Sequence, residues 1–294
     1  MSILIDRHSK IVVCGITGQM GRFHTQKCLA YGSQIVAGVN PDKGRTFLEC
    51  DTAKIPIFCT VAEAREATKA NVALIFVPPA FATDSIFECI EAEIPLVIAI
   101  TEGIPVHDMV RVKARLARSS TRLIGPNGPG VLCPGKCNAS IMPTQVALPG
   151  RVGIVSKSGT LTYEAMWQLS QHGIGQSTCV GIGGDPITGT SHSDVIKLFN
   201  EDPETDAIVM IGEIGGLSEV QAAEYVSKHG SKPLVAFIAG SSAPKAKRMG
   251  HAGAMITGNS DTAAAKIAAL RDYHIPVAEL PSQIAQTLLT VYRP

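Results

Sequence analysis

The chain has few aromatic residues, few charged residues and almost no net charge. Of its 294 residues, 5% are aromatic and 17% are charged, and the formal net charge is +1. A nearly neutral chain without a long basic run has no field to attract nucleic acid or an anionic membrane, so we expect neither as a partner. Its hydrophobic content of 45% and its 28 glycines are instead typical of an α/β protein with buried sheets and tight loops.

Long hydrophobic runs and closely paired cysteines are also missing. No apolar run approaches the length of a membrane span, and the first residues do not form a secretion signal. The eight cysteines include no C-x-x-C pair, and no histidine pair accompanies Cys133 and Cys137, which argues against a zinc site. We therefore expect reduced cysteines, no bound metal, and a cytoplasmic protein or a processed matrix protein.

Short β-branched segments alternate with helical patterns in the first half of the chain. Strands are predicted at 11–14, 35–39, 72–77, 96–100 and 122–124, and helices at 23–31, 61–68, 81–92 and 106–117. Repeated strand–helix–strand units predict a doubly wound parallel sheet. The alternation stops between Gly125 and Gly150, where five prolines occur, and we expect a domain junction there.

The alternation then restarts. Strands are predicted at 152–155, 178–182, 207–211 and 233–239, and helices at 161–171, 194–199, 218–228, 261–273 and 282–291. This pattern predicts a second open α/β sheet of the flavodoxin-like kind. We expect an N-terminal Rossmann-like domain over residues 1–126 and a C-terminal flavodoxin-like, doubly wound domain over residues 127–294.

A glycine-rich loop follows the first predicted strand. Gly15, Gly18 and Gly21 give the spacing G-x-x-G-x-x-G at the start of the first helix. Backbone amides at such a helix start can cradle a phosphate, although tight strand-to-helix packing alone requires similar glycines. After the second strand, Asp42 keeps NAD open as a ligand, whereas Lys43 suits a phosphorylated ribose, such as that of coenzyme A or NADP.

The fourth predicted strand ends at Ile100, Thr101 and Glu102, shortly before Pro105. These residues lie at the carboxyl end of a parallel strand, where ligands bind in open α/β sheets. Thr101 and Glu102 are also suited to cap the helix that begins near Pro105. Both interpretations, ligand contact and helix cap, therefore remain open.

In the second half, four loops follow strand ends and are expected to share one crevice. They are Ser156–Thr160, Gly183–Gly184, Glu213–Gly216 and Met249–Ala254. The carboxyl ends of parallel strands meet at one edge of an open sheet, so these loops should converge. The last loop carries His251 among small residues, directly after three basic residues at 245–248.

These loops bring together a histidine, a carboxylate and a helix start. Neutral His251 is suited to attack phosphorus with one ring nitrogen while Glu213 accepts a hydrogen bond from the other. The helix start offers amides and hydroxyls to phosphoryl oxygens. The expected phosphate ligands are Ser156, Ser158, Gly159 and Thr160. Each residue alone has an ordinary structural interpretation, but their combination predicts a phosphoryl-transfer site.

Seven segments carry motifs that together are specific. They are Gly15–Gly18, Ile100–Pro105, Gly125–Asn127, Gly153–Ala165, Val180–Pro186, Ile211–Gly216 and Arg248–Ala254. Jointly they resemble the α subunit of succinyl-CoA synthetase (succinate–CoA ligase), and the similarity covers essentially the whole chain.

The resemblance implies a set of ligands and roles. It implies that the first domain binds coenzyme A through Thr17, Gly18, Gln19, Met20, Lys43, Ile100, Thr101 and Glu102. It implies that a nucleoside triphosphate phosphorylates His251, that Glu213 orients this histidine, and that Tyr163 lies near the bound acid. The phosphoryl group would pass to succinate before the CoA thiol attacks. ATP or GTP and Mg²⁺ would belong to a β subunit with an ATP-grasp domain, in an αβ or α₂β₂ assembly.

The chain departs from the family pattern at a few positions. Gly128 stands where the family usually has Cys, and Thr257–Ser260 replaces a Gly-Gly-Lys-Gly stretch. The second change is slightly closer to malate–CoA ligase α subunits, so malate or a related dicarboxylate is an alternative substrate. A noncatalytic CoA-sensing protein and an NADP-dependent oxidoreductase are the alternatives from other functional classes.

Overall fold

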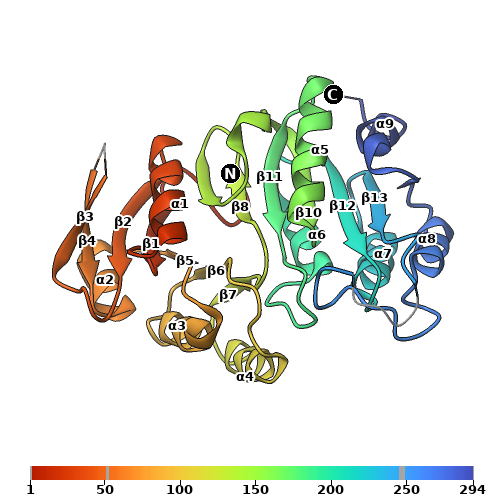
Figure 1. The fold of residues 1–294 in the computed structure, drawn as a ribbon. Coiled ribbons are helices and arrows are strands. Elements are labelled where there is room, and N and C mark those ends of the chain that lie inside the picture. Colours follow the sequence, from red (N-terminus) through yellow and green to blue (C-terminus); the bar gives the residue numbers. More distant parts are fainter. Residues whose placement is uncertain (1, 51–52, 245–248, 294) are drawn as a thin grey trace.

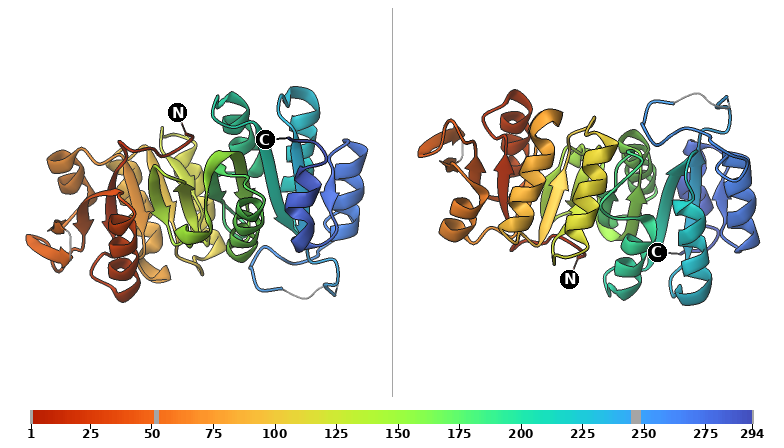
Figure 2. Two further views of the ribbon diagram at one scale, coloured as in Figure 1. Left: turned by 90° about the horizontal axis from the view of Figure 1, so that it is seen from above. Right: turned by 90° about the horizontal axis from the view of Figure 1, so that it is seen from below.

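The structure, a computed structural model, describes residues 2–50, 53–244 and 249–293. Within these ranges two seven-stranded sheets lie side by side with helices packed against them. Figure 1 and Figure 2 show that the elements broadly follow chain order from one end of the molecule to the other. No helix in these ranges is long and apolar enough to cross a membrane.

The first sheet has the Rossmann strand order. Its strands are β1 (Lys10–Cys14), β2 (Gln34–Val39), β3 (Thr46–Cys50), β4 (Ala53–Phe58), β5 (Val72–Ile75), β6 (Leu96–Ala99) and β7 (Arg122–Ile124), and its helices are α1 (Gln19–Ala30), α2 (Val61–Thr68), α3 (Pro79–Glu91) and α4 (Val106–Leu116). The order across the sheet is β3-β4-β2-β1-β5-β6-β7. Only β3 is antiparallel to its neighbour, and the parallel strands, counted along the chain, stand as 3-2-1-4-5-6.

The second sheet has the flavodoxin-like order. Its strands are β8 (Gly130–Cys133), β9 (Cys137–Ser140), β10 (Pro149–Ser156), β11 (Gln176–Gly181), β12 (Ala207–Glu213), β13 (Leu234–Ala239) and β14 (Val277–Ala278). The helices are α5 (Gly159–Gln171), α6 (His192–Glu201), α7 (Ser218–His229), α8 (Ala263–Asp272) and α9 (Ile284–Leu288), with short 3₁₀ turns η1 (Thr144–Val146) and η2 (Pro281–Gln283). Across the sheet the order is β14-β13-β12-β10-β11-β8-β9. Its parallel strands, β10 to β14, therefore stand as 2-1-3-4-5 along the chain, and the predicted fold class is confirmed.

Two antiparallel hairpins were absent from the sequence prediction. The hairpin of β3 and β4 extends the edge of the first sheet, and the hairpin of β8 and β9 extends the second sheet beyond β11. The β9 segment, Cys-Asn-Ala-Ser, has no β-branched residue, yet all four of its residues are buried. Tertiary packing rather than local propensity makes it a strand. The helix predicted at 282–291 is also shorter, because η2 precedes α9.

The chain passes from the first sheet to the second between Ile124 and Gly130, and this connection is bonded to both halves. The Asn127 amide donates to the Thr101 carbonyl at 2.9 Å, and the Gly184 amide donates to the Asn127 carbonyl at 3.1 Å. We propose the domain limits 1–126 and 127–294 because the sheet changes here.

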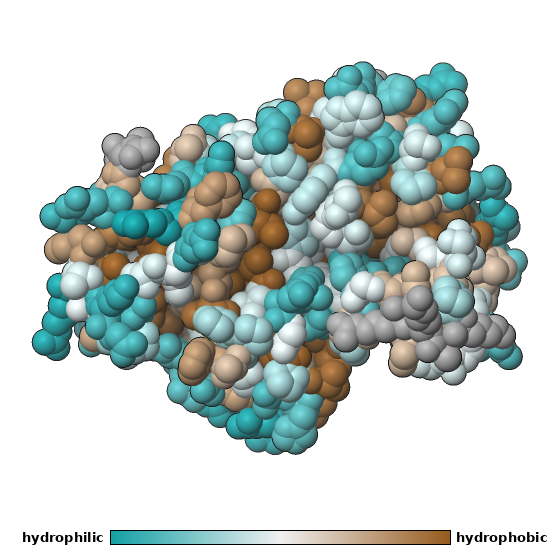
Figure 3. All heavy atoms as spheres, in the orientation of Figure 1, coloured by the Kyte–Doolittle hydropathy of each residue, from teal (hydrophilic) through white to brown (hydrophobic). Residues whose placement is uncertain are grey.

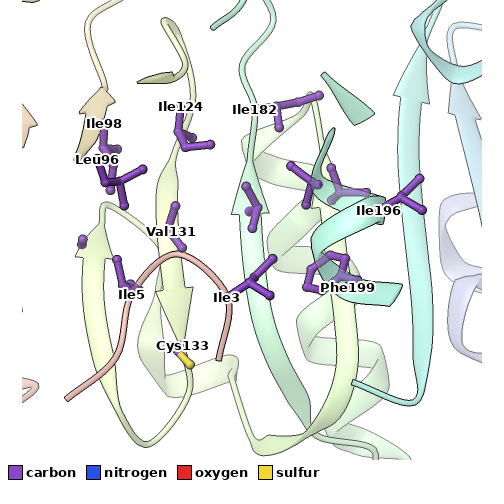
Figure 4. Close-up of a cluster of buried hydrophobic side chains, with 14 of the residues drawn as sticks. Ile3, Ile5, Leu96, Ile98, Ile124, Val131, Cys133, Ile182, Ile196 and Phe199 are labelled. Carbon is purple, nitrogen blue, oxygen red and sulfur yellow. The ribbon is translucent and has the colours of Figure 1, made fainter. Parts of the chain in front are cut away.

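Apolar packing is continuous between the two halves. One buried cluster includes Ile98 of β6 and Ile182 after β11. Figure 4 shows the N-terminal segment with Ile3 and Ile5 lying across this cluster, with Ile98 to one side and Phe199 to the other. On the outside, Figure 3 shows hydrophilic side chains over the outer margins of one face and apolar surface toward the middle of its left half. The shared core fixes the two sheets against each other.

Replacing Gly21 with alanine should destabilise the first half. The added Cβ would lie 2.2 Å from the Gly15 carbonyl oxygen, where α1 packs on the glycine-rich loop. We expect the free energy of unfolding to fall by about 1–3 kcal/mol. Gly258→Ala is the matched control, because its Cβ would meet no atom closer than 3.8 Å. Chemical denaturation of both variants measures the difference, and equal stability would contradict the packing described.

Candidate active site

A cavity of about 810 Å³ opens where the strand order of the first sheet reverses, between β1 and β5. Ligands of open α/β sheets bind at such a point. Four of the residues predicted to bind coenzyme A line this cavity: Thr17, Gly18, Gln19 and Met20. The structure therefore groups the glycine-rich loop around one space of a size that accommodates a large ligand.

The glycine-rich loop is arranged as an anion site at a helix start. Gly18 directly precedes α1, and the first turn of α1 has no acidic residue, so the positive end of the helix dipole is not compensated there. The Asn40 side chain donates to Thr17 Oγ1 at 2.6 Å, which ties the loop to the end of β2. The Gly15 amide donates to the Val39 carbonyl at 3.1 Å, so the loop is bonded to the end of β2 through its backbone as well.

One face of α3 also lines the cavity and was not identified from the sequence. Its contributors are Phe81, Asp84, Ser85 and Glu88. Burial raises the pKa of Glu88, although its carboxylate accepts a hydrogen bond from the Val61 amide at 2.8 Å. An amphipathic helix pattern indicates which face is apolar, but not which residues border a loop from another strand.

The other predicted CoA contacts are not part of the cavity lining but adjoin it, since Asp42 and Val77 line the cavity. Lys43 is exposed, and Ile100 continues β6 by donating its amide to the Ile75 carbonyl at 3.2 Å. The Thr101 hydroxyl donates to the Val77 carbonyl at 2.6 Å. Glu102 is close enough to His251 for its charge to help raise the pKa of that histidine. Glu102, which follows the end of β6 in the first sheet, therefore acts electrostatically on His251 in the second site.

His251 and Glu213 meet as the strand-end argument predicts. His251 Nδ1 lies 2.7 Å from Glu213 Oε2, and the two side chains are 27% and 8% exposed. A carboxylate can only accept, so the hydrogen bond places the proton of neutral His251 on Nδ1. The Nε2 lone pair is then available to attack an electrophile.

Glycines make this contact possible. A Cβ on Gly184 would lie 2.2 Å from His251 Cγ, so the loop after β11 approaches the imidazole too closely for any side chain. The Gly253 amide donates to the Gly184 carbonyl at 3.0 Å, and a Cβ on Gly215 would lie 2.2 Å from the Gly253 carbonyl oxygen. Three of the four predicted loops are thus in direct contact around His251.

The fourth loop, at the start of α5, adjoins the others at the edge of the sheet. The Lys157 amide donates to the Ile211 carbonyl at 3.2 Å, beside the point where the order of the second sheet reverses between β10 and β12. Ser158 caps α5 by accepting from the Leu161 amide at 3.3 Å. Gly159 and Thr160 begin the helix, where amides lack intrahelical acceptors.

Ser156 differs from the other predicted phosphate ligands. It is fully buried, and its hydroxyl donates to the Ser158 carbonyl at 2.9 Å while accepting from the Ser158 amide at 3.0 Å. This hydroxyl shapes the loop and does not face an open site. The partly exposed Ser158 and the first amides of α5 are the groups that can face an anion.

Tyr163 lies one turn into α5 and leans back over its start. Its hydroxyl would be 3.5 Å from a Cβ on Gly159, and burial raises the pKa of this phenol. Tyr163 therefore borders the same helix start. The basic residues at 245–248, which were expected beside His251, lie outside the described residues.

Glu213 also controls the charge of His251. The hydrogen bond that His251 donates to Glu213 is the main reason that the pKa of His251 is raised above its ordinary value. Burial opposes this rise, and the charges of Asp185 and Glu102 add to it. A raised pKa means that the protonated form is favoured in the fold. Its stabilising contribution is full at pH values below the ordinary pKa and is lost as pH rises through the raised value.

Among the described residues, no group of three or more metal-binding side chains is assembled. The site brings together an imidazole, a carboxylate and a helix start, which are groups suited to carrying a phosphoryl anion.

Two family models match the chain. The model described as CoA binding domain matches residues 6–103, and the one described as CoA-ligase matches residues 155–275. The first range contains the glycine-rich loop, and the second contains Glu213 and His251.

Curated relatives match over nearly the full length. The chain is 52% identical over 295 residues to a protein of Aquifex aeolicus named succinate–CoA ligase [ADP-forming] subunit alpha, covering 100% of this chain and 95% of that protein. A Staphylococcus epidermidis protein of the same name is 52% identical over 289 residues, covering 98% and 94%.

Solved structures share the fold. ATP citrate lyase of Methanosaeta concilii, in complex with (3S)-citryl-CoA, superposes with a TM-score of 0.90 at 27% identity. The superposition covers 99% of this chain and 50% of the lyase chain. This chain thus spans about half of the lyase chain. A dinucleotide-forming acetyl-coenzyme A synthetase of Ca. Korarchaeum cryptofilum gives a TM-score of 0.78 at 24% identity, covering 98% of this chain and 62% of that one. The second likeness shows the fold alone.

Replacing Glu213 with glutamine should lower the pKa of His251. The amide keeps the shape of the carboxylate but removes the charge that stabilises the imidazolium. NMR titration of the His251 ring measures this pKa, and Glu224→Gln is the control because Glu224 pairs with Lys228 on the exposed face of α7. An unchanged His251 pKa in Glu213→Gln would show that the hydrogen bond does not control its charge.

Proposed function

Because this chain belongs to the family of succinate–CoA ligase α subunits, we propose that it acts in an acid–CoA ligase that joins succinate to coenzyme A. The nucleoside triphosphate is converted to diphosphate and phosphate. The observation that carries the proposal is the contact of His251 Nδ1 with Glu213, which leaves Nε2 free at the edge of the sheet.

The proposed reaction has three steps. First, His251 Nε2 bonds to the γ-phosphorus while the bond from phosphorus to the bridging oxygen breaks, and nucleoside diphosphate leaves. Second, a succinate carboxylate oxygen bonds to phosphorus as the N–P bond breaks, giving an acyl phosphate and restoring neutral His251. Third, the CoA thiolate, its proton lost to solvent, attacks the acyl carbon, and phosphate leaves.

The residues of the second site would stabilise the charges that develop on the His251 ring and on the phosphoryl group. Glu213 holds His251 in the tautomer that can attack and stabilises the positive ring that forms during transfer. The start of α5, with Ser158, Gly159 and Thr160, would hold the phosphoryl oxygens at its positive end. Ser156 would hold the shape of this turn through its hydrogen bonds to the Ser158 backbone. Tyr163 would lie next to the bound succinate.

Coenzyme A would bind in the cavity of the first domain. Thr17, Gly18, Gln19 and Met20 would contact its phosphates and neighbouring groups. Lys43, exposed in the loop after β2 and next to Asp42 of the cavity lining, would reach the ribose phosphate. Ile100, Thr101 and Glu102 continue from β6 toward His251, and we propose that the thiol end of the ligand extends along them.

The proposed partner is a β subunit with an ATP-grasp domain, which would bind ATP or GTP with Mg²⁺ in an αβ or α₂β₂ assembly. The relatives named as α subunits support a second subunit. Malate or a related dicarboxylate is the alternative acid. We propose a cytoplasmic location, since Cys28, Cys133 and Cys179 are buried free thiols, as expected in a reducing compartment.

Phosphorylation of His251 tests the function directly. The chain is incubated with its β partner and γ-labelled nucleotide, and the label bound to the α chain should be acid-labile and base-stable. His251→Ala should lose it, whereas His229→Ala, which changes a histidine at the end of α7, should keep it. Label that persists in His251→Ala would refute the proposal, and binding of CoA without any label would favour a noncatalytic sensor.

A further inference from the structure

The Glu213 loop rests on a lysine that has no part in the steps above. Lys266 of α8 is fully buried, and its Nζ donates to the Glu213 carbonyl at 2.6 Å and to the Gly215 carbonyl at 2.7 Å. The third hydrogen bond, to Glu219 Oε2, is 2.6 Å long. All three protons of the ammonium group are therefore used, and two of them hold the backbone of the loop that carries Glu213.

Glu219 holds the same loop from the other side. Its side chain is fully buried, and its Oε1 accepts a hydrogen bond from the Glu213 amide at 3.3 Å. The same oxygen lies 3.4 Å from Nζ of Lys157, the residue before the cap of α5. Both main-chain polar groups of Glu213 are thus bonded to one buried ion pair, and this pair also contacts the loop at the α5 start.

Buried cations surround Glu219. Lys157 and Lys266 both contact its carboxylate, and the three side chains are between 0% and 12% exposed. Burial alone would raise the pKa of Glu219, but the neighbouring cations lower it to about 2. Burial lowers the pKa of Lys266, and Glu219 opposes this. The pair is therefore held as two ions.

Two further titratable groups pack here. Asp261 accepts a hydrogen bond from the Gly215 amide through its backbone carbonyl at 2.9 Å, and its side chain bonds to Thr257 and Gly258. His192 adds no charge. Burial lowers its pKa to about 4, and its ring is bonded to the Ser218 hydroxyl at 2.8 Å and to the Ile211 carbonyl at 3.1 Å. The Glu219–Lys266 pair is the charged group that bonds the backbone of Glu213 itself.

The Glu213 side chain itself has little to hold it. Oε2 contacts His251, and Oε1 is buried without a hydrogen-bond partner among the described residues. The direction of the carboxylate is therefore set mainly by where its backbone lies. A buried ion pair is weak as a source of stability, because apolar residues of similar volume often serve equally well. The hydrogen bonds that this pair makes to the Glu213 and Gly215 backbone would be lost with apolar residues in its place.

We propose that Lys266, together with Glu219, is a positioning residue that fixes the Glu213 backbone so that the carboxylate meets His251 at Nδ1. Lys266 touches no reacting atom. It acts through Glu213, and the inference rests on the phosphohistidine function proposed above. Its loss should misplace the carboxylate, distribute neutral His251 between both tautomers and slow phosphorylation by about a hundredfold.

The test compares three variants in the full chain. Lys266→Met removes the cation, and Glu219→Gln/Lys266→Met removes both charges of the pair, so that Glu219 is not left as a buried carboxylate without Lys266 if the single variant does not fold. Lys157, which is 12% exposed, loses its partner in the double variant. Lys228→Met is the matched control, because Lys228 forms a 2.6 Å pair with Glu224 on an exposed helix face. Thermal unfolding selects the folded variants.

Two measurements are made on each folded variant. NMR of the unphosphorylated chain reports the tautomer and pKa of His251, which is also influenced by Asp185 and Glu102. Labelling with γ-labelled nucleotide in complex with the β partner gives the rate. We expect mixed tautomers, a pKa nearer its ordinary value and a rate about a hundredfold lower in the Lys266 variants, with Lys228→Met unchanged.

The outcomes separate this inference from the function. A folded Lys266 variant with the wild-type tautomer overturns the positioning role, whether or not its labelling is slower, because a slow rate alone could follow from structural damage. Wild-type chain that never becomes labelled refutes the phosphohistidine function, while the NMR comparison still tests Lys266.

Discussion

The hydrogen bond between His251 Nδ1 and Glu213 Oε2, 2.7 Å long, is the contact on which the second half depends. It selects one tautomer of the imidazole and leaves the other nitrogen free, and it requires a carboxylate in a fixed place at a strand end. β12 supplies that place by ending at Glu213. The loop after β11 has glycine at position 184 because the imidazole of His251 lies so close that a Cβ there would have no room.

Backbone hydrogen bonds beside this contact connect the two halves. A series of backbone hydrogen bonds runs from Thr101 at the end of β6, through Asn127, to Gly184 and on to Gly253 in the His251 loop, at 2.9, 3.1 and 3.0 Å. The Asn127 side chain also donates to Asp185 at 3.0 Å. The connection between the sheets is therefore part of the site, and the edge of the CoA-binding half is held beside His251.

Strand ends made much of this predictable. The loops that follow parallel strands lie at one edge of the sheet, where ligands bind. His251 and Glu213 could therefore be predicted to lie together although 38 positions separate them. The alternation of strands and helices also predicted two doubly wound sheets, but not the antiparallel hairpins at their edges. Sequence could not show that Ser156 is buried, because a hydroxyl before a helix has the same pattern whether it faces a ligand or its own loop.

Lys266 illustrates the other limit. It stands in the run Ala-Ala-Ala-Lys-Ile-Ala-Ala-Leu, where a lysine normally lies on the solvated face of a helix, and its partners are about 50 positions away. The cavity face of α3 was missed for a similar reason, since Phe81 and Glu88 border a loop from another strand. Such residues are defined by the tertiary packing that surrounds them.

The identity of the phosphorylated nitrogen tests the central claim most directly. The chain, phosphorylated in complex with its β partner and labelled with ¹⁵N in histidine, is measured by ³¹P–¹⁵N correlation NMR. The Glu213 contact occupies Nδ1, so the phosphorus should be bonded to Nε2 of His251. Phosphorus bonded to Nδ1 would contradict the account.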